Sequence, residues 1–389
     1  MTQQSKYKMI YLDNAASTPT DSRVVEAMLP YFNTIYGNPS AIHPMGCHSS
    51  DALENARRQV AALINCHPED IIFTSGGTEA DNLALLGLTA ASVTKGNHII
   101  TSQIEHHAIL ETCHHLEKKG IQITYLPVDR HGMVAPEAVR DAIRPDTVLV
   151  SVMAANNVIG TIQPITEIGA VCREKGVFFH TDAVQLVGHL PVDVEKSQID
   201  LLSLSAHKFN GPKGVGALFA RREVPLSPII FGGGQEEALR SGTENVPGIV
   251  GLGMAAEIAG SEITSESARI HDLSLKLING ILNGIPGVRL NGHPENRLPN
   301  NINVSIPGIE GEYLTRELGK RGVCVSTGSA CSSGTHEAPY VLLATGLERD
   351  LANCSIRLSL GKMSDEDSVR QTINILSDVC SRIRAQSVI

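Results

Sequence analysis

Between residues 71 and 219, short runs rich in β-branched residues alternate with longer segments in which apolar residues recur at the period of a helix. Such alternation predicts a mostly parallel sheet covered by helices on both faces, because neighbouring parallel strands are joined by helical crossovers. An α/β fold is therefore expected. Seven strands are predicted for this sheet, at residues 71–74, 99–102, 123–127, 148–153, 177–180, 201–203 and 216–219.

The pattern changes beyond about residue 260. A long helical stretch over residues 264–282 precedes separate strands and a final helix, which is the order typical of a smaller α+β unit. We therefore expect two domains. The large domain spans residues 15–259, and the small α+β domain combines residues 1–14 with residues 260–389.

Composition narrows the class of protein. Of the 389 residues, 42% are hydrophobic, as in an ordinary globular protein, and no apolar run is long enough to span a bilayer. The net charge of −9 argues against direct binding of nucleic acid, which depends on clustered Lys and Arg. The eight cysteines form no Cys-x-x-Cys pair, which disfavours a disulfide framework or a zinc ribbon. We expect a cytoplasmic protein with reduced thiols, no membrane contact, and small molecules and proteins as ligands.

A glycine-rich segment, Thr74–Glu79, joins a predicted strand to a predicted helix. Glycines let the backbone approach a ligand, and a helix N-terminus presents free N–H groups, so this segment is a candidate phosphate cradle. It lacks the lysine of a P-loop and the spacing of a dinucleotide fingerprint, so it does not require a nucleotide. A simple tight turn is the alternative interpretation.

Two further segments place reactive side chains after strands. The strand at residues 177–180 delivers Asp182 and Gln185 at its carboxyl end, where a carboxylate can hold a protonated ring nitrogen of a cofactor; a helix N-cap is the alternative role for Asp182. Lys208 follows the strand at residues 201–203 and can form a Schiff base if its pKa is lowered. A solvated surface lysine is the alternative, and it is the preferred interpretation of Lys213.

These segments are parts of a longer resemblance. The chain resembles the cysteine desulfurases of the NifS/IscS-like group, in the class V aminotransferase family of fold type I pyridoxal-phosphate enzymes, nearly from end to end. The matching blocks are Tyr11–Ala16, Tyr36–Ser40, Thr74–Asn82, Glu105–His106, Asn156–Asn157, His180–Gln185, Ser205–Lys208, Arg240–Thr243, Ser326–Ser333 and Ser355–Leu360.

The resemblance implies a cofactor, pyridoxal 5'-phosphate, and a role for each matching residue. Lys208 would carry the cofactor as a Schiff base, Asp182 would pair with its ring nitrogen, and His106 would stack on the ring and carry a proton. Gln185 would face the phenolic oxygen, and Asn157 with Arg357 would bind the substrate carboxylate, Asn157 also touching the cofactor. The phosphate would be held by Gly77, Thr78, Ser205, His207 and, from the partner subunit of a homodimer, Thr243.

Cys331 is the residue that distinguishes a cysteine desulfurase from other pyridoxal-phosphate enzymes in this interpretation. It lies among small residues at positions 326–334, where a thiol without a use would be a liability, so we interpret it as the nucleophile. Sulfur of L-cysteine would pass to Cys331 as a persulfide, leaving L-alanine, and then to a sulfur-acceptor protein. Cys324 we assign to the core. The acceptor stays open: an iron–sulfur scaffold, a tRNA-thiolation enzyme, a cofactor pathway or a DNA-sulfur modification system.

Other readings of the same residues stay open. A selenocysteine lyase or an aminotransferase would use the same Lys208 and Asp182, and a sulfur-relay scaffold would keep the fold without turnover. The run of His, Cys and Glu at residues 105–115 is a rival zinc site, although we predict no metal there because His106 serves the cofactor. Val158 and Asn210 depart from the family pattern and bear on the orientation of Asn157.

Overall fold

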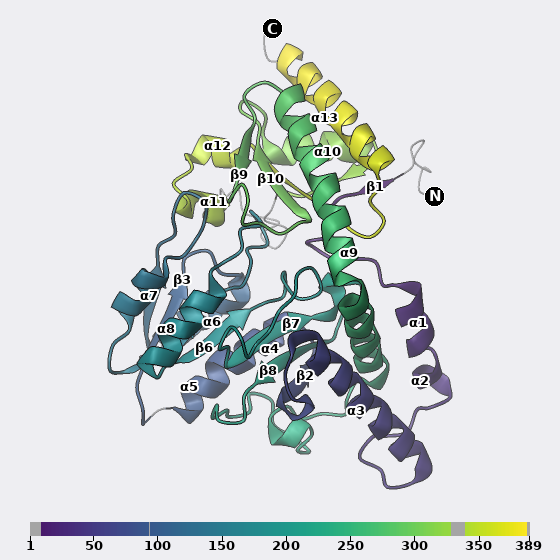
Figure 1. The fold of residues 1–389 in the computed structure, drawn as a ribbon, viewed down its shortest axis with the longest axis vertical. Helices are drawn as coiled ribbons and strands as arrows, with labels where there is room; N and C mark the ends of the chain where they lie inside the picture. Colours follow the sequence, from purple (N-terminus) through teal and green to yellow (C-terminus); the bar gives the residue numbers. More distant parts are fainter. Residues whose placement is uncertain (1–8, 93, 328–338, 387–389) are drawn as a thin grey trace.

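A computed structural model describes residues 9–92, 94–327 and 339–386. Within this part of the chain, the central sheet has seven strands and is mostly parallel, as the alternating pattern predicted (Figure 1). Only β8 runs antiparallel to its two neighbours. In spatial order the strands are β2 (Ile71–Thr74), β8 (Gly216–Ala220), β7 (Leu201–Ser205), β6 (Phe178–Asp182), β5 (Thr147–Ser151), β3 (His98–Ser102) and β4 (Gln122–Leu126).

Helices cover both faces of this sheet, because alternate residues of each strand pack into two separate apolar clusters. Phe179 and Phe219 belong to the cluster on one face, and Leu149 and Leu218 belong to the other. The first face is covered by α3 (Pro44–Ile64), α7 (Pro136–Ala142), α8 (Ile165–Lys175) and part of α9. The second is covered by α4 (Gly77–Asn82), the π-helical η2 (Leu83–Gly87), α5 (Leu88–Ala91) and α6 (His107–Glu117).

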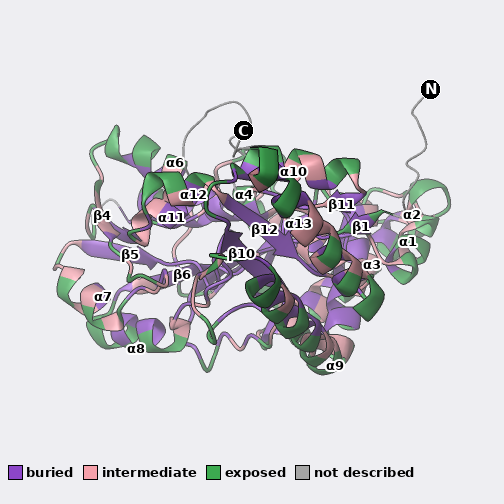
Figure 2. Ribbon diagram, turned by 90° about the horizontal axis from the view of Figure 1, so that it is seen from above, coloured by how far each residue is buried: buried purple, intermediate pink, exposed green. Residues whose placement is uncertain are grey.

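A third apolar cluster forms the core of the C-terminal part of the chain. There an antiparallel sheet has the order β12 (Ser355–Ser359), β10 (Asn301–Ser305) and β9 (Arg289–Asn291). Its strands β10 and β12 are buried throughout, as Figure 2 shows. The N-terminal strand β1 (Ile10–Tyr11) pairs with β11 (Val323–Cys324), and Leu12 enters this same core. The remaining helices here are α10 (Gly311–Lys320), α11 (Tyr340–Ala344), α12 (Arg349–Asn353) and α13 (Glu366–Gln386).

The long helix α9 (Val246–Gly284) connects the two parts and differs from the expected helix at residues 264–282. Its first half contains glycines, which lower helix propensity and obscure the pattern. At Gly253 a Cβ would come within 2.6 Å of Ala56 Cα, so glycine permits close packing of α9 on α3. By length and composition α9 is able to cross a membrane, but 56% of its apolar window is buried inside the protein. The expected domain boundary near residue 260 falls inside this helix and stays a prediction.

Short elements complete the described fold. The sequence-based assignment of Cys324 to the core was wrong. Cys324 is only half-buried, because it lies at the end of the two-residue strand β11. The short helices are α1 (Ser22–Met28), α2 (Pro30–Asn33), η1 (Pro68–Asp70), η3 (Ala206–Lys208) and η4 (Glu236–Ala238).

Candidate active site

The carboxyl edge of the central sheet collects the predicted cofactor residues. Asp182 is the last residue of β6, and Lys208 lies in the single turn of η3 that follows the neighbouring strand β7. His106 precedes α6, four residues after the end of β3. Since parallel strands end at one edge of a sheet, the chain brings these three side chains together there.

Asp182 is a buried carboxyl group, 5% exposed. Burial raises its pKa, whereas the nearby His106 imidazole and Lys208 amine lower it. One of its oxygens, Oδ1, accepts a hydrogen bond from the backbone N–H of Val184 at 3.0 Å. A carboxylate at this depth is stabilised by a cationic partner, so it fits a protonated ring nitrogen.

His106 is the N-cap of α6, and its Nδ1 accepts a hydrogen bond from Ala108 N–H at 3.1 Å. A neutral imidazole has one donor and one acceptor nitrogen, so this cap places the ring proton on Nε2. Burial lowers the pKa of His106, which favours that neutral form. The side chain thus offers a flat ring with one N–H directed away from the helix.

Lys208 is held by a segment to which the sequence reasoning gave no role. Its Nζ donates hydrogen bonds to the backbone oxygens of Ala15, at 2.8 Å, and Ala16, at 3.0 Å. The Ala15 oxygen also accepts from Gln185 Nε2 at 3.0 Å. The amine therefore lies beside the amide predicted to face the phenolic oxygen. We call residues 13–18 the N-terminal segment.

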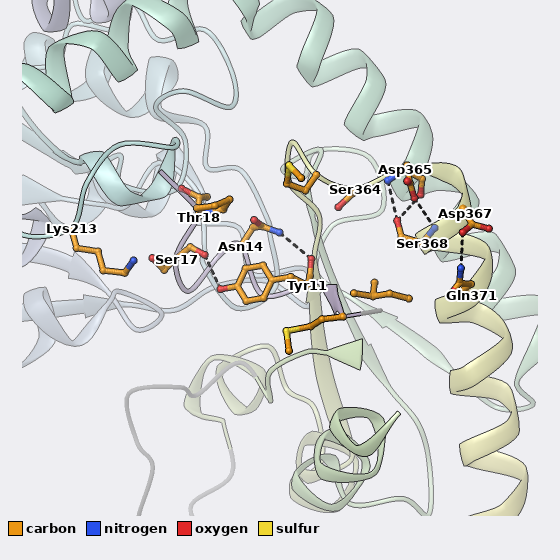
Figure 3. Close-up of a pocket in the computed structure, with 14 residues that line it drawn as sticks. Tyr11, Asn14, Ser17, Thr18, Lys213, Ser364, Asp365, Asp367, Ser368 and Gln371 are labelled. Atoms are coloured by element: carbon orange, nitrogen blue, oxygen red, sulfur yellow. Dashed lines mark hydrogen bonds between the residues drawn. The ribbon is translucent and has the colours of Figure 1, made fainter. Parts of the chain in front are cut away.

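The same segment reaches the predicted phosphate residues. Ser17 Oγ lies 3.2 Å from His207 Nδ1, and Thr18 donates to the backbone oxygen of His207. The sequence indicated this role only through the family-matching block Tyr11–Ala16. None of the side chains in that block was assigned to the site. The outer side of the segment lines a pocket of about 660 Å³ between β1 and the start of α13 (Figure 3).

The glycine-rich turn fits a phosphate cradle. Gly76 has φ of +155°, which is open to glycine, and a Cβ on Gly77 would come 2.6 Å from Val184 Cγ2 and 3.7 Å from Ser205 Cβ. Gly77 and Thr78 open α4, so their N–H groups lack helical partners. Burial and the neighbouring lysines lower the pKa of His207 to about 4, so its imidazole is neutral at pH 7.

Arg357, on β12, supplies a guanidinium group that is almost fully buried, with 3% of its side chain exposed. Its Nη2 donates to Asp13 Oδ1 at 2.8 Å, and its Nη1 donates to the backbone oxygen of Asn157 at 2.9 Å. Arg357 Nε and Asn157 Oδ1 are buried and lack a hydrogen-bond partner among the described residues. A carboxylate ligand would satisfy the Nε donor.

The predicted site residue Thr243 has no hydrogen bond or ion pair with the others in the described part of the chain. Thr243 is exposed in the single chain, in a turn where Arg240 pairs with Glu79 of α4 at 2.8 Å. Cys331 lies outside the described residues. The described residues before and after Cys331 in the chain contact residues of the site or next to it. Ser326 forms a backbone bridge with Arg357, and the Tyr340 hydroxyl donates to the backbone oxygen of Glu105.

Residues 105–115, the rival zinc site, are spread over different environments. Cys113 lies on the buried face of α6, and burial raises its pKa to about 12. His107 is half-buried and His114 is exposed, and their Nδ1 atoms lie 4.0 and 3.7 Å from Glu111 Oε1. Throughout residues 9–327 and 339–386, apart from residue 93, no three His, Cys, Asp or Glu side chains are grouped to hold a metal ion.

Comparisons with known proteins agree with this geometry. The class-V aminotransferase family model matches residues 10–371. Cysteine desulfurase IscS of Methanosarcina thermophila is 50% identical over 98% of this chain and 94% of its own length, and that of Dictyoglomus turgidum is 49% identical over 97% and 96%. A solved NifS-like protein superposes with a TM-score of 0.91 at 40% identity, over 96% of this chain and all of that one. DndA from Streptomyces lividans superposes at 0.77 with 37% identity, over 90% and 99%. The chain belongs to the class-V aminotransferase family and, within it, to the cysteine desulfurases, which are pyridoxal-phosphate enzymes.

Proposed function

We propose that the chain holds pyridoxal phosphate on Lys208 and moves sulfur from L-cysteine to Cys331, leaving L-alanine. The observation that carries this proposal is the convergence of Asp182, His106 and Lys208 at one edge of the sheet, where Lys208 lies close enough to influence the pKa of both Asp182 and His106. A selenocysteine lyase or an aminotransferase would use the same Lys208 and Asp182. Only sulfur transfer to the protein requires a thiol at Cys331.

Each side of the cofactor has a matching group in this chain. Asp182 would pair with the ring nitrogen, His106 would cover the ring, and Gln185 would face the phenolic oxygen. The bound cofactor supplies an electron-withdrawing ring that stabilises negative charge on the substrate α-carbon. The phosphate would be held by Gly77, Thr78, Ser205, His207 and the partner subunit's Thr243.

The side chains of the protein then perform the proton and sulfur transfers. Arg357 and Asn157 bind the substrate carboxylate and orient its α-carbon. Lys208 Nζ leaves the carbonyl groups of Ala15 and Ala16, takes the α-proton as a base, and is positioned to return it to the product. The thiolate of Cys331 attacks the substrate sulfur. The new S–S bond forms as the C–S bond of the substrate breaks. The electron pair of the broken C–S bond stays with the substrate carbon until protonation gives L-alanine.

The proposed active form is a homodimer with cytoplasmic location. Thr243 is exposed in the single chain, and in the proposed dimer it would reach the partner's phosphate site across the interface. Large apolar side chains are exposed on α1, α2 and the following loop, and Ile42 is 99% exposed. Such a patch is typical of a surface that a second copy covers. The exposed apolar residues are Val25, Leu29, Phe32, Tyr36 and Ile42.

The sulfur leaves the enzyme on an acceptor protein. The curated relatives are named IscS, and a solved neighbour is named DndA. Iron–sulfur cluster assembly, thiolation and DNA sulfur modification are the candidate destinations that we propose. Copurification from cells, with mass spectrometry of the bound proteins, identifies which of these acceptors the enzyme serves.

The test is sulfur transfer by the purified holoenzyme. With L-cysteine, wild type is expected to form L-alanine in step with a persulfide, which peptide mass spectrometry locates on Cys331. Cys331→Ser keeps the visible absorbance of the cofactor but forms no persulfide, and Cys47→Ser, which changes an exposed cysteine on α3, is the matched control. Full activity of Cys331→Ser, or a borohydride-reduced cofactor found on a residue other than Lys208, would refute the proposal. A fully active monomer in light scattering would refute the dimer.

A further inference from the structure

The guanidinium group of Arg357 already has a carboxylate partner in the protein. Its Nη2 lies 2.8 Å from Asp13 Oδ1, and this contact is monodentate among the described residues because Arg357 Nε has no partner there. The opposite nitrogen, Nη1, is occupied by the backbone oxygen of Asn157. The edge with the unsatisfied Nε–H is therefore left for a further acceptor.

Asp13 is held in place by the backbone on both sides of its side chain. It forms a β-bridge to Ser359, two residues from Arg357 on the same strand. Ser359 N–H donates to the Leu12 oxygen at 2.7 Å, and Ala15 N–H donates to Ser359 Oγ at 2.9 Å. The carboxylate is thus fixed to the strand that carries Arg357, and its distance from the guanidinium does not depend on a flexible loop.

Burial explains why Arg357 needs such a partner. With 3% of its side chain exposed, a guanidinium group has lost most of its hydration, and an unpaired charge at this depth is strongly unfavourable. Asp13 is more accessible, with 22% of its side chain exposed, so its carboxylate keeps part of its hydration. It neutralises Arg357 whenever no substrate is present.

We propose that Asp13 is a resident counter-ion that sets the affinity of Arg357 for the carboxylate of the amino-acid substrate and product. This inference rests on the proposed function, in which Arg357 binds that carboxylate. When the ligand binds, two carboxylates share one guanidinium group, and their repulsion weakens binding. The same repulsion favours release of the product L-alanine, because L-alanine carries its carboxylate on the α-carbon just as L-cysteine does.

The experiment separates the charge of Asp13 from its hydrogen bond. Asp13→Asn keeps an oxygen that accepts from Arg357 Nη2 but removes the negative charge. The dissociation constants of L-alanine and of ethylamine, which lacks only the carboxylate, are measured on the holoenzyme by titration of the visible absorbance. We expect Asp13→Asn to bind L-alanine about tenfold more tightly, with ethylamine unchanged. Asp13→Ser, which also removes the charge, is expected to shift L-alanine in the same direction.

Asp146→Asn is the matched control, because Asp146 pairs with Arg144 on the surface, directly before β5 of the central sheet, and should alter neither ligand. Unchanged or weaker binding of L-alanine in both Asp13 variants, with ethylamine binding intact, would overturn the inference and leave the proposed function standing. If Arg357→Gln bound L-alanine as tightly as wild type does, or if wild type gave no response to L-alanine, the proposed carboxylate site and this inference would both be wrong.

Discussion

The floor of the candidate site and its carboxylate-binding side are built by different parts of the molecule. Asp182, Lys208 and His106 follow strands of one sheet, so each side chain is positioned by the strand directly before it. Arg357 lies on a separate sheet and is held by Asp13 and by the backbone of Asn157, from segments more than 190 residues away in sequence. The floor therefore depends on local chain geometry, and the carboxylate side depends on long-range packing.

The two regions also differ in their electrostatics. In the floor, the buried carboxyl of Asp182 influences a second buried carboxyl, Asp81, whose pKa is raised by burial and by the charge of Asp182. At the carboxylate-binding side, the buried guanidinium group of Arg357 is paired with the partly exposed carboxylate of Asp13. A change in the floor should therefore act on the cofactor, whereas a change at Arg357 should act on substrate affinity.

Asp182→Asn should give the largest effect. Removing the charge opposite the ring nitrogen should lower kcat roughly 10²–10³-fold, because the ring loses the partner that keeps it electron-withdrawing. Rates of L-alanine formation, together with the visible spectrum of the cofactor, measure this loss. Asp200→Asn changes another buried carboxyl, in the turn before β7, and should keep kcat. A wild-type rate in Asp182→Asn would mean that the floor does not act through this charge.

Arg357→Lys should separate the two regions most clearly. Lysine keeps the charge but loses the planar fork, so KM for L-cysteine should rise roughly 10- to 100-fold while cofactor content stays unchanged. Steady-state kinetics and the cofactor-to-protein ratio provide the two readouts. A loss of cofactor with unchanged KM would place Arg357 in the floor and break the comparison.

Gly77→Ala should weaken cofactor binding about tenfold, because the new methyl group meets Val184 Cγ2 at 2.6 Å and displaces the cradle. Equilibrium dialysis of the cofactor measures the effect. The double variant with Val184→Ala should recover most of the affinity, since the clashing atom is gone. Gly260→Ala in α9 meets only Leu63 at 3.8 Å and serves as the control. No recovery in the double variant would contradict the steric cause.

Glu105→Gln should have the smallest effect on catalysis, because it should act on the free energy of unfolding instead. Burial raises the pKa of Glu105 to about 8 from an ordinary value of 4.5, so the folded protein keeps a proton that the unfolded chain releases. The contribution of this bound proton to the free energy of unfolding is complete below about pH 4. It is lost as the pH rises to 8, at up to roughly 1 kcal/mol per pH unit. Urea unfolding between pH 5 and 8 should show a shallower decline in the variant. An equal slope in both proteins would show that Glu105 is ionised when folded.

Much of the fold was predictable because its signals are local. The alternating pattern placed the strands of the central sheet. Lys208 follows β7 as expected, whereas Asp182, expected after a strand that ends at residue 180, is itself the last residue of β6. The first half of α9 was missed, because its glycines lower helix propensity and only packing against α3 keeps them helical. Cys324 was misplaced because an apolar run does not reveal whether a strand end is covered.

The sequence by itself determined where along the chain the strands of the large sheet lie, although not the residue at which most of them end. Through the family resemblance it also determined the chemistry expected of the side chains near those ends. Only the tertiary structure decided which groups hold those residues in place: the carbonyl groups of Ala15 and Ala16 on Lys208, and Asp13 on Arg357. The physical reason is that backbone carbonyls carry no residue identity and that a salt bridge across 344 residues leaves no periodic pattern in the chain. Such contacts exist only once both cores have packed and brought the N-terminal segment between them.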